Sequence, residues 1–424
     1  MEMQINYNDP LIMHIDLNSA YAMIEQQANP LIRNKPVAIA AYDTPRGMII
    51  ASSYEAKRIG IKLGVNVAEA RLIDRNVIIL TPDPEKYFDA HRRFKKVLLN
   101  YTNNVTPKSV DEFVVDFRGS EAIRRGMTMQ QIGMQIKQDI KDALGEYVTV
   151  NVGIGTNRFL AKMAAGLNKP DGLDTITGEN LREVYSKLEL IDLTGINVRY
   201  QARLKAAGIH TPLQFLDTPA HVLKKEVFRS IVGYYWYVRL RGHEIDNVDT
   251  KTRSFGQQYA LGQKTYDRQE LSRLLMKLCE KTGRRLRKHN YAANGVHLML
   301  GFEDRKYWAK GRKQKSDVYA TQDIFYAAQR LLDSATIHCK VTNMSITVFD
   351  LHPETHSQQS LFDNTRLDRR SLAVAADEVN DRYGEFTLIP ALMTNMQDTI
   401  LKRVPFGSVR DMDLWRRNDK ILKL

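Results

Sequence analysis

The sequence predicts a multidomain protein of the α+β class. Its 424 residues exceed the usual size of a single domain, so about two to four domains are expected. Residues 246–254 are polar and non-periodic, which is typical of a linker. After them, helical segments alternate with strand-like runs, which indicates a sheet with helices on one face. The helical segments are 268–289 and 321–334, and the strand-like runs are 255–261, 295–302, 316–319 and 340–351.

The part before the linker also mixes short strands with helices. Apolar periodicity predicts a strand at Leu11–Asp16 and a helix from Ala20 to Ala28, which Asn18 and Ser19 can cap. A basic helix face that includes His91 is expected in the helix at 84–99. Further strands are predicted at 35–41, 47–53, 76–80 and 148–155, and further helices at 54–59 and 127–144.

The segment Val105–Phe117 (VTPKSVDEFVVDF) carries two adjacent carboxylates, Asp111 and Glu112, between apolar β-formers. This pattern predicts a buried strand or the crest of a hairpin. Burying two neighbouring ionised carboxylates is costly unless a cation meets them. From these residues two interpretations stay open: a strand edge whose acids face water, or a divalent-metal site.

Three more motifs carry chemistry. Asp16 ends a predicted strand just before a helix begins, a place that favours an anion together with its metal. Residues 153–172 predict a strand followed by an Ala-rich helix that carries Lys162, and the P-loop pattern is absent there. Residues 190–216, with Gly195 in the turn, predict a helix-hairpin-helix element. Such a hairpin either presents N–H groups to DNA phosphates or serves only for packing.

The charge of the chain points to a polyanionic partner. The formal net charge is +13 and the pI is about 9.5, which suggests nucleic acid or an anionic membrane face. Between Lys251 and Lys315, 17 Lys and Arg stand against 5 Asp and Glu. This clustering predicts a nucleic-acid-binding face, and the alternative is a solvated helix face.

The sequence also indicates where in the cell the protein is expected. No apolar stretch is long enough to span a bilayer, and the polar N-terminus is not a secretory signal. The two cysteines, Cys279 and Cys339, lack the spacing of metal ligands. We therefore expect a cytoplasmic protein without membrane contact, disulfide frame or zinc site.

Residues 356–363 (HSQQSLFD) leave the folded pattern. An apolar pair, Leu361 and Phe362, follows a polar run, which suits docking into a pocket on a partner. A helix is predicted at 372–383, and residues 404–424 are expected to be loosely structured.

Taken together, these motifs resemble the Y-family DNA polymerases, and most closely the bacterial UmuC-like branch of translesion polymerases. The resemblance covers about residues 11 to 363, and four stretches carry it: HIDLNSAYAMIE, ASSYEAKRIGIKLG, SVDEFVVDF and GIGTNRFLAKMAAGLNKPDG. It implies a right-hand polymerase with a palm (sheet plus helices), small fingers, a helical thumb with a helix-hairpin-helix, and an α+β little finger. The implied domains are a palm at 1–19 and 82–175, fingers at 20–81, a thumb at 176–246, a linker at 247–254, a little finger at 255–354 and a tail at 355–424.

The resemblance also implies the roles of individual residues. It makes Asp16, Asp111 and Glu112, with the main-chain carbonyl of Leu17, the ligands of two Mg²⁺ ions. It makes Tyr21 the steric gate that rejects ribonucleotides. Three residues are expected to hold the incoming triphosphate: Tyr54, Lys57 and Lys169. The segment Gln358–Phe362, with Gln358, Leu361 and Phe362 as contacts, resembles the peptide that binds the bacterial sliding clamp.

The implied function is template-directed, low-fidelity translesion synthesis in DNA damage tolerance and SOS mutagenesis. Primer–template DNA, dNTP and the sliding clamp are the expected partners, with a UmuD-type subunit and a recombinase filament as further candidates. Asn197 departs from the family's usual glycine in the hairpin, and Met48 and Ile50 stand where the family often has small residues. Two other classes stay open: another two-metal palm enzyme, such as a nucleotide cyclase, and a catalytically silent DNA- and clamp-binding protein.

Overall fold

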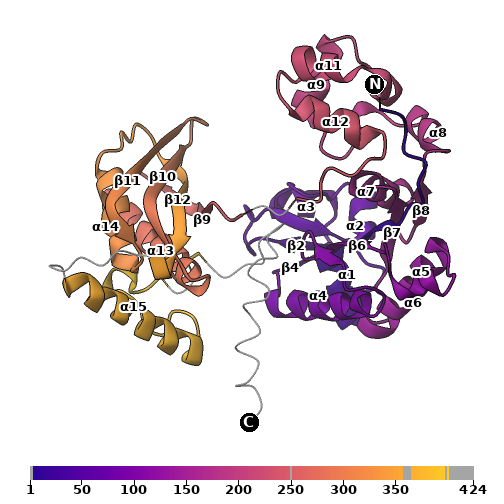
Figure 1. Cartoon of the computed structure of the whole chain (residues 1–424). Coiled ribbons are helices and arrows are strands. Elements are labelled where there is room, and N and C mark those ends of the chain that lie inside the picture. Colours follow the sequence, from indigo (N-terminus) through magenta and orange to yellow (C-terminus); the bar gives the residue numbers. More distant parts are fainter. Residues whose placement is uncertain (1–2, 249–250, 357–363, 397–398, 401–424) are drawn as a thin grey trace. The chain divides into compact units, whose positions relative to one another are not determined.

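The computed structural model describes residues 3–248, 251–356, 364–396 and 399–400. These residues divide into two compact units, one up to Val248 and one from Asp249 onward. Figure 1 shows the first unit in indigo to pink and the second in orange to yellow. No helix in the described ranges is long and apolar enough to cross a membrane.

The first unit is built on a five-stranded sheet in the order β5-β6-β1-β7-β8. The central strand β1 is almost entirely buried and pairs antiparallel with β6 on one side and with β7 on the other. Strands β7 and β8 run parallel, and β5 and β6 form a hairpin. The strands are β1 (Ile12–Leu17), β5 (Val105–Pro107), β6 (Glu112–Asp116), β7 (Val150–Gly155) and β8 (Leu173–Ile176).

Helix α7 (Arg158–Leu167) lies directly on β7, and two glycines permit this close approach. A Cβ atom on Gly153 would lie 2.1 Å from the Ala161 carbonyl oxygen, and one on Gly155 would lie 2.5 Å from the Ala161 nitrogen. These glycines therefore serve helix–sheet packing. Helices α4 (Pro84–Leu99) and α6 (Met129–Leu144) pack against each other, with the short α5 (Glu121–Arg124) before α6.

A second, three-stranded sheet of the first unit has the order β3-β2-β4. Its strands are β2 (Val37–Ala40), β3 (Ile49–Ser52) and β4 (Ile78–Leu80), and its helices include α1 (Ala20–Ala28), η1 (Pro30–Ile32), α2 (Tyr54–Arg58) and α3 (Val67–Ile73). The predicted bounds of α1 are confirmed, but its predicted cap is wrong. Ser19 has a left-handed backbone with φ of 49°, and its side chain does not cap this helix. Helix α3 was not predicted, although Asn66 and Glu69 form a capping box at its start.

Residues 181–240 are helical. Gly195 does form a tight turn, with φ of 97°, but the helix before it is a single 3-10 turn. The elements are α8 (Leu181–Ser186), η2 (Leu190–Asp192), α9 (Val198–Ala206), α10 (Pro212–Asp217), α11 (Ala220–Val222), η3 (Leu223–Val227) and α12 (Val232–Leu240). Their buried faces form one apolar cluster around Phe215 and Trp236.

The second unit confirms the predicted sheet with helices on one face. Its antiparallel sheet has the order β11-β10-β12-β9, and buried residues alternate along β10 and β12. The elements are β9 (Ser254–Thr265), α13 (Arg268–Lys288), β10 (Tyr291–Phe302), β11 (Tyr307–Val318), α14 (Thr321–Asp333), β12 (Val341–Pro353) and η4 (Glu354–His356). Strand β11 is much longer than the predicted 316–319, because most of this edge strand is polar, basic and exposed and so gives no apolar alternation.

Residues 364–400 contain more structure than the predicted helix at 372–383. Helix α15 (Asn364–Tyr383) begins earlier, and η5 (Ala391–Met393) follows it. Met393, Met396 and Ile400 are buried in the same apolar core as the sheet of the second unit. The described part of the region expected to be a tail is therefore packed against the domain that precedes it.

Candidate active site

The candidate carboxylates come together at one end of the ladder between β1 and β6. Asp16 on β1 lies directly opposite Glu112, the first residue of β6. The backbone N–H of Leu17 donates to the carbonyl oxygen of Asp111 at 2.9 Å. The structure thus confirms neighbouring strands for Asp16 and Glu112, with Asp111 immediately before β6 rather than on a strand.

Asp111 lies in the bend that precedes β6, at the crest of the β5–β6 hairpin. The N–H groups of Lys108 and Ser109 donate to the carbonyl oxygen of Glu112 and close the crest. The Ser109 hydroxyl donates to the Asp111 carboxylate at 2.5 Å. This is the strand-end geometry that two neighbouring residues need if both are to face one side of a sheet.

Two lysines meet the acids in the structure. Lys169 forms an ion pair with Asp16, and Lys162 on α7 pairs with Glu112 at 2.9 Å. Lys169, which is expected to contact the triphosphate, therefore lies beside the acids. No role was assigned to Lys162 from the sequence, although a lone lysine among the buried apolar residues of α7 was a usable signal.

Burial makes the ionised state of these acids costly. It raises the pKa of Asp16 to about 6, and the attraction of Lys169 offsets this only in part. Burial also raises the pKa of Asp111, against the hydrogen bond from Ser109. Burial acts on Glu112 too, but the Lys162 ammonium outweighs it and lowers the pKa of this carboxyl. Acids that burial destabilises in this way favour a bound cation.

The donor set suits a hard divalent ion, because carboxylate and carbonyl oxygens are what Mg²⁺ prefers. His14 is the neighbouring imidazole, 3.7 Å from Glu112, and burial lowers its pKa to about 4. In the described ranges one group of three Asp, Glu, His or Cys side chains has its ligand atoms all within 4.8 Å of one another, and it is Asp304, His338 and Cys339. The three carboxylates of the candidate site are not such a group, and each of them accepts from a donor of its own: Asp16 from Lys169, Asp111 from Ser109 and Glu112 from Lys162.

Tyr54 and Lys57 line the same end of the sheet. The Tyr54 hydroxyl donates to Asn18 at 3.2 Å, and the Lys57 ammonium donates to the Ser19 hydroxyl at 2.6 Å. Burial lowers the pKa of Lys57, and the nearby Lys169 ammonium adds to this. The three residues expected to hold a triphosphate thus gather around Asp16. The same contacts explain why Asn18 and Ser19 do not cap α1.

Tyr21, the candidate gate, lies in the first turn of α1 and is 3% exposed. Its ring stacks on Tyr87 with 4.2 Å between centroids and 11° between planes. Burial raises the pKa of Tyr21, and the Asp111 carboxylate adds to this, so the phenol lies near the acids.

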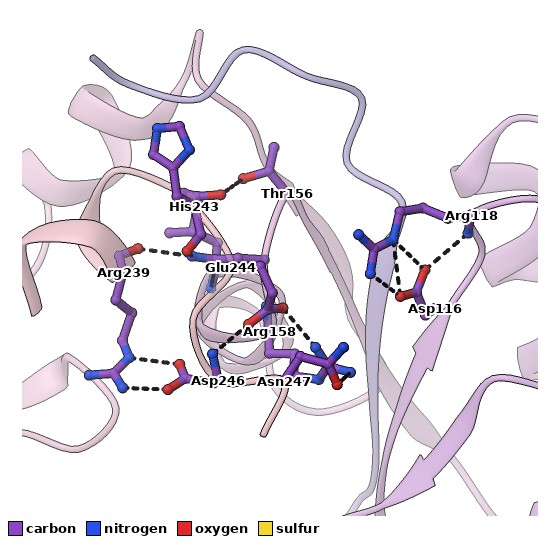
Figure 2. A network of polar contacts seen from close by, with 12 residues as sticks. Asp116, Arg118, Thr156, Arg158, Arg239, His243, Glu244, Asp246 and Asn247 are labelled. Carbon is purple, nitrogen blue, oxygen red and sulfur yellow. Dashed lines mark hydrogen bonds and ion pairs between the residues drawn. The ribbon is translucent and has the colours of Figure 1, made fainter. Parts of the chain in front are cut away.

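Helix α7 carries Lys162, and its first turn is fixed by several contacts, of which those of Arg158 are drawn in Figure 2. Asn157 caps it by accepting from the Leu160 N–H, and its amide donates to the carbonyls of Arg239 and His243. Arg158 pairs with Glu244 at 2.9 Å. The helix therefore holds Lys162 from a start that is tied to the residues after α12.

Comparison with known proteins shows the family. Two models of the impB/mucB/samB family match the chain: the family model over residues 15–166, and the model of its C-terminal domain over residues 252–361. A curated DNA polymerase IV of Pelotomaculum thermopropionicum is 30% identical over 387 residues, which cover 90% of this chain and 94% of that protein. One of Moorella thermoacetica is 31% identical over 391 residues, with 89% and 94% covered. The chain belongs to the Y family of DNA polymerases.

Solved structures agree on the fold. A Y-family DNA polymerase chimera matches with a TM-score of 0.70 at 21% identity, covering 80% of this chain and 98% of that one. The DinB structure from Sulfolobus solfataricus matches with a TM-score of 0.51 at 22% identity and the same coverage. The predicted α+β right-hand fold is confirmed, and the chain is a DNA-directed DNA polymerase of the translesion class.

The basic segment of the polymerase is not one surface. On α13, Arg287 pairs with Asp377 of α15 at 2.5 Å, and Lys277 donates to the Met396 carbonyl. On β11, by contrast, Lys310 and Arg312 are exposed. The segment predicted to bind nucleic acid therefore divides into an internal part and an outward part.

Two other sequence predictions for the polymerase have different outcomes. His91 does not belong to an exposed basic face, because it is 4% exposed, stacks on Phe113 and contacts the Val110 carbonyl. The candidate clamp contacts Gln358, Leu361 and Phe362 lie outside the described residues.

Proposed function

We propose that this polymerase performs template-directed, low-fidelity nucleotidyl transfer with two Mg²⁺ ions. Asp16, Asp111 and Glu112, with the carbonyl of Leu17, would hold the ions. The observation that carries this proposal is the pairing of Asp16 with Glu112 across β1 and β6, with Asp111 beside them in the bend. Bound there, the ions would activate the primer 3′-hydroxyl and neutralise the leaving pyrophosphate.

The lysines at the site would then act on the substrate. Lys169, whose side chain is 39% exposed, is able to exchange its contact with Asp16 for a phosphate oxygen. Lys57 and Tyr54 add a second ammonium and a hydroxyl donor from the fingers side of the site. Fixed donors of this kind stabilise the charge that develops on the triphosphate. Tyr21 would stand against the sugar and reject a 2′-hydroxyl.

We assign the palm to residues 1–19 and 82–175, the fingers to 20–81, the thumb to 176–246 and the little finger to 255–354, after the linker 247–254. Two solved structures with the same fold are ternary complexes of Dbh DNA polymerase, which supports primer–template DNA and a nucleotide as partners. The exposed cations of β11 would bind the duplex through its phosphates.

Recruitment by the sliding clamp through Gln358, Leu361 and Phe362 is part of the proposal. Deleting Gln358–Phe362 should leave distributive synthesis unchanged and remove stimulation by the clamp. The curated relatives are named DNA polymerase IV, so the UmuC-like branch, the UmuD-type subunit, the recombinase filament and the SOS role remain predictions without support from those names.

Primer extension tests the mechanism. Asp111→Ala should lower incorporation by a factor on the order of 10³ or more, since the metal contribution is worth several kcal/mol. Binding of primer–template DNA should stay within about twofold of that of the unmodified chain. The matched control is Asp116→Asn on the same hairpin strand, whose carboxylate pairs with Arg118.

Full incorporation by the Asp111 variant would refute the site. Absence of Mg²⁺-dependent incorporation by the unmodified chain would favour a silent DNA- and clamp-binding protein. Incorporation without a primer would favour another two-metal enzyme.

A further inference from the structure

Tyr87 is a buried aromatic residue to which the proposed metal site assigns no role. It lies in the first turn of α4 and is 0% exposed. Its ring forms the nearly parallel stack with Tyr21 at 4.2 Å. Tyr87 therefore covers one face of the ring that we assign as the gate.

The hydroxyl of Tyr87 also has a partner. It donates to the Glu25 carboxylate at 3.0 Å, and the other carboxylate oxygen of Glu25 receives the Lys86 ammonium at 2.6 Å. Glu25 is 7% exposed, and a buried carboxylate persists only where donors satisfy it.

These contacts link Tyr87 to two side chains of α1. Tyr21 and Glu25 are four residues apart on α1, so they lie on the same face of that helix. Tyr87 contacts both, with its ring on Tyr21 and its hydroxyl on Glu25. At the other side, α4 is set by Asp83, which accepts from the Lys86 N–H, and by Pro84 at the first helical position. The Tyr21 ring is thus fixed from two helices.

We propose that Tyr87 is a positioning residue that sets the discrimination between deoxyribonucleotides and ribonucleotides by holding the ring of Tyr21. The proposal rests on the assignment of Tyr21 as the gate. Steric exclusion acts over less than a bond length, so a gate ring that tilts by a fraction of an ångström admits a 2′-hydroxyl. A rotatable tyrosine needs a support of this kind to exclude the hydroxyl consistently.

The test compares incorporation of one rNTP and its matching dNTP by the full chain, as the ratio of their kcat/KM values. This ratio is insensitive to the fraction of folded enzyme. Tyr87→Leu, which removes the stacked ring, should raise the ratio in favour of the rNTP by about 3- to 10-fold, the range of measured aromatic pairs. Tyr87→Phe, which keeps the ring but loses the Glu25 hydrogen bond, should raise it by about 2- to 5-fold.

Tyr101 provides the matched control. Its hydroxyl donates to the Asp139 carboxylate at 2.6 Å, so Tyr101→Phe loses the same kind of hydrogen bond in the same unit. Tyr101 follows the far end of α4, roughly 20 Å along the helix from Tyr87. The ratio of this variant should equal that of the unmodified chain.

A double variant decides whether Tyr87 acts through Tyr21. Tyr21→Ala should raise the ratio strongly, and adding Tyr87→Leu to it should change the ratio no further. If both Tyr87 variants leave the ratio unchanged while Tyr21→Ala raises it, the gate stands and the role of Tyr87 is refuted. If Tyr87→Leu raises the ratio equally with and without Tyr21, the role is also refuted. If Tyr21→Ala itself leaves the ratio unchanged, the gate assignment fails.

Discussion

Two regions of this polymerase, the carboxylate end of the first sheet and helix α13 of the second unit, use their cations in opposite ways. Beside the carboxylates of the first unit, Lys162 and Lys169 each have a side chain that is 39% exposed. On α13 of the second unit, the Arg287 side chain is 4% exposed and pairs with Asp377. The two lysines are therefore accessible to a ligand, whereas the Arg287 side chain is buried in the contact between α13 and α15. The number of basic residues in a segment does not tell a ligand-binding cation from a structural one, but the exposure and the partner of each side chain do.

The largest effect expected from this comparison is on stability. Arg287→Met should lower the free energy of unfolding of the second unit by about 3 kcal/mol, because the buried Tyr319 carbonyl loses the Arg287 donor and Asp377 keeps the longer ion pair with Arg284 at 3.5 Å. Amide hydrogen exchange in α13 and α15 measures this. The control is Lys306→Met, whose side chain is 76% exposed. Unchanged exchange would mean that the α13 cations are not structural.

The next effect is on catalysis. Lys169→Ala should lower kcat/KM for dNTP incorporation by about 100-fold, the usual result of removing one fixed donor to a developing anion, with little change in melting temperature. Single-turnover incorporation measures it. Lys187→Ala serves as the control, because that ammonium pairs with the exposed Glu183. If the melting temperature falls far enough for unfolding to account for the loss of activity, a direct role of Lys169 in catalysis is contradicted.

A smaller effect is expected in DNA binding. Replacing Lys310 and Arg312 by alanine should reduce the slope of log K against log salt by about 1 for each phosphate that these cations neutralise. Lys281→Ala should leave the slope unchanged, since this ammonium donates to the Ile400 carbonyl. Equal slopes for the two sets of variants would remove the distinction between outward and internal cations.

The smallest effect concerns the start of α9, just after the turn at Gly195. Asn197 accepts from the N–H groups of Arg199 and Tyr200, which a DNA phosphate would otherwise be able to use. Asn197→Gly should cost only a few tenths of a kcal/mol in stability and tighten DNA binding by about twofold. Binding titrations at fixed salt measure the change. Thr211→Gly, which removes the cap of α10, should not tighten binding.

Much of the candidate site was predictable because it is local in the sequence. The apolar runs around Asp16 and Asp111 define strands, and strands that end in acids predict where those acids meet. The bend at Asp111 followed from the alternation of a strand, since two neighbouring residues otherwise face opposite sides.

The rest depends on contacts between distant residues. The lone lysine of α7 is visible in the sequence, but its partner Glu112 is not, and the stack of Tyr87 on Tyr21 leaves no local pattern. The docking of α15 on α13 was hidden for a related reason, because basic residues on a helix have the same sequence pattern whether they face solvent or another helix. The length of β11 was missed because an exposed edge strand needs only its ladder with β10.

Because β1 is paired on both edges, the geometry of the candidate site is sensitive to insertions in its strands. Asp16 meets Glu112 on one side of β1 and Asn151 on the other, so a shift of one residue in β1 would have to break two ladders. Such a shift would turn Asp16 to the opposite face of the sheet. Single-residue insertions within residues 12–17 or 112–116 should therefore be less tolerated than most substitutions there. The acids also assemble only when the sheet has formed, so the affinity of the proposed metal site would report on folding of the first unit.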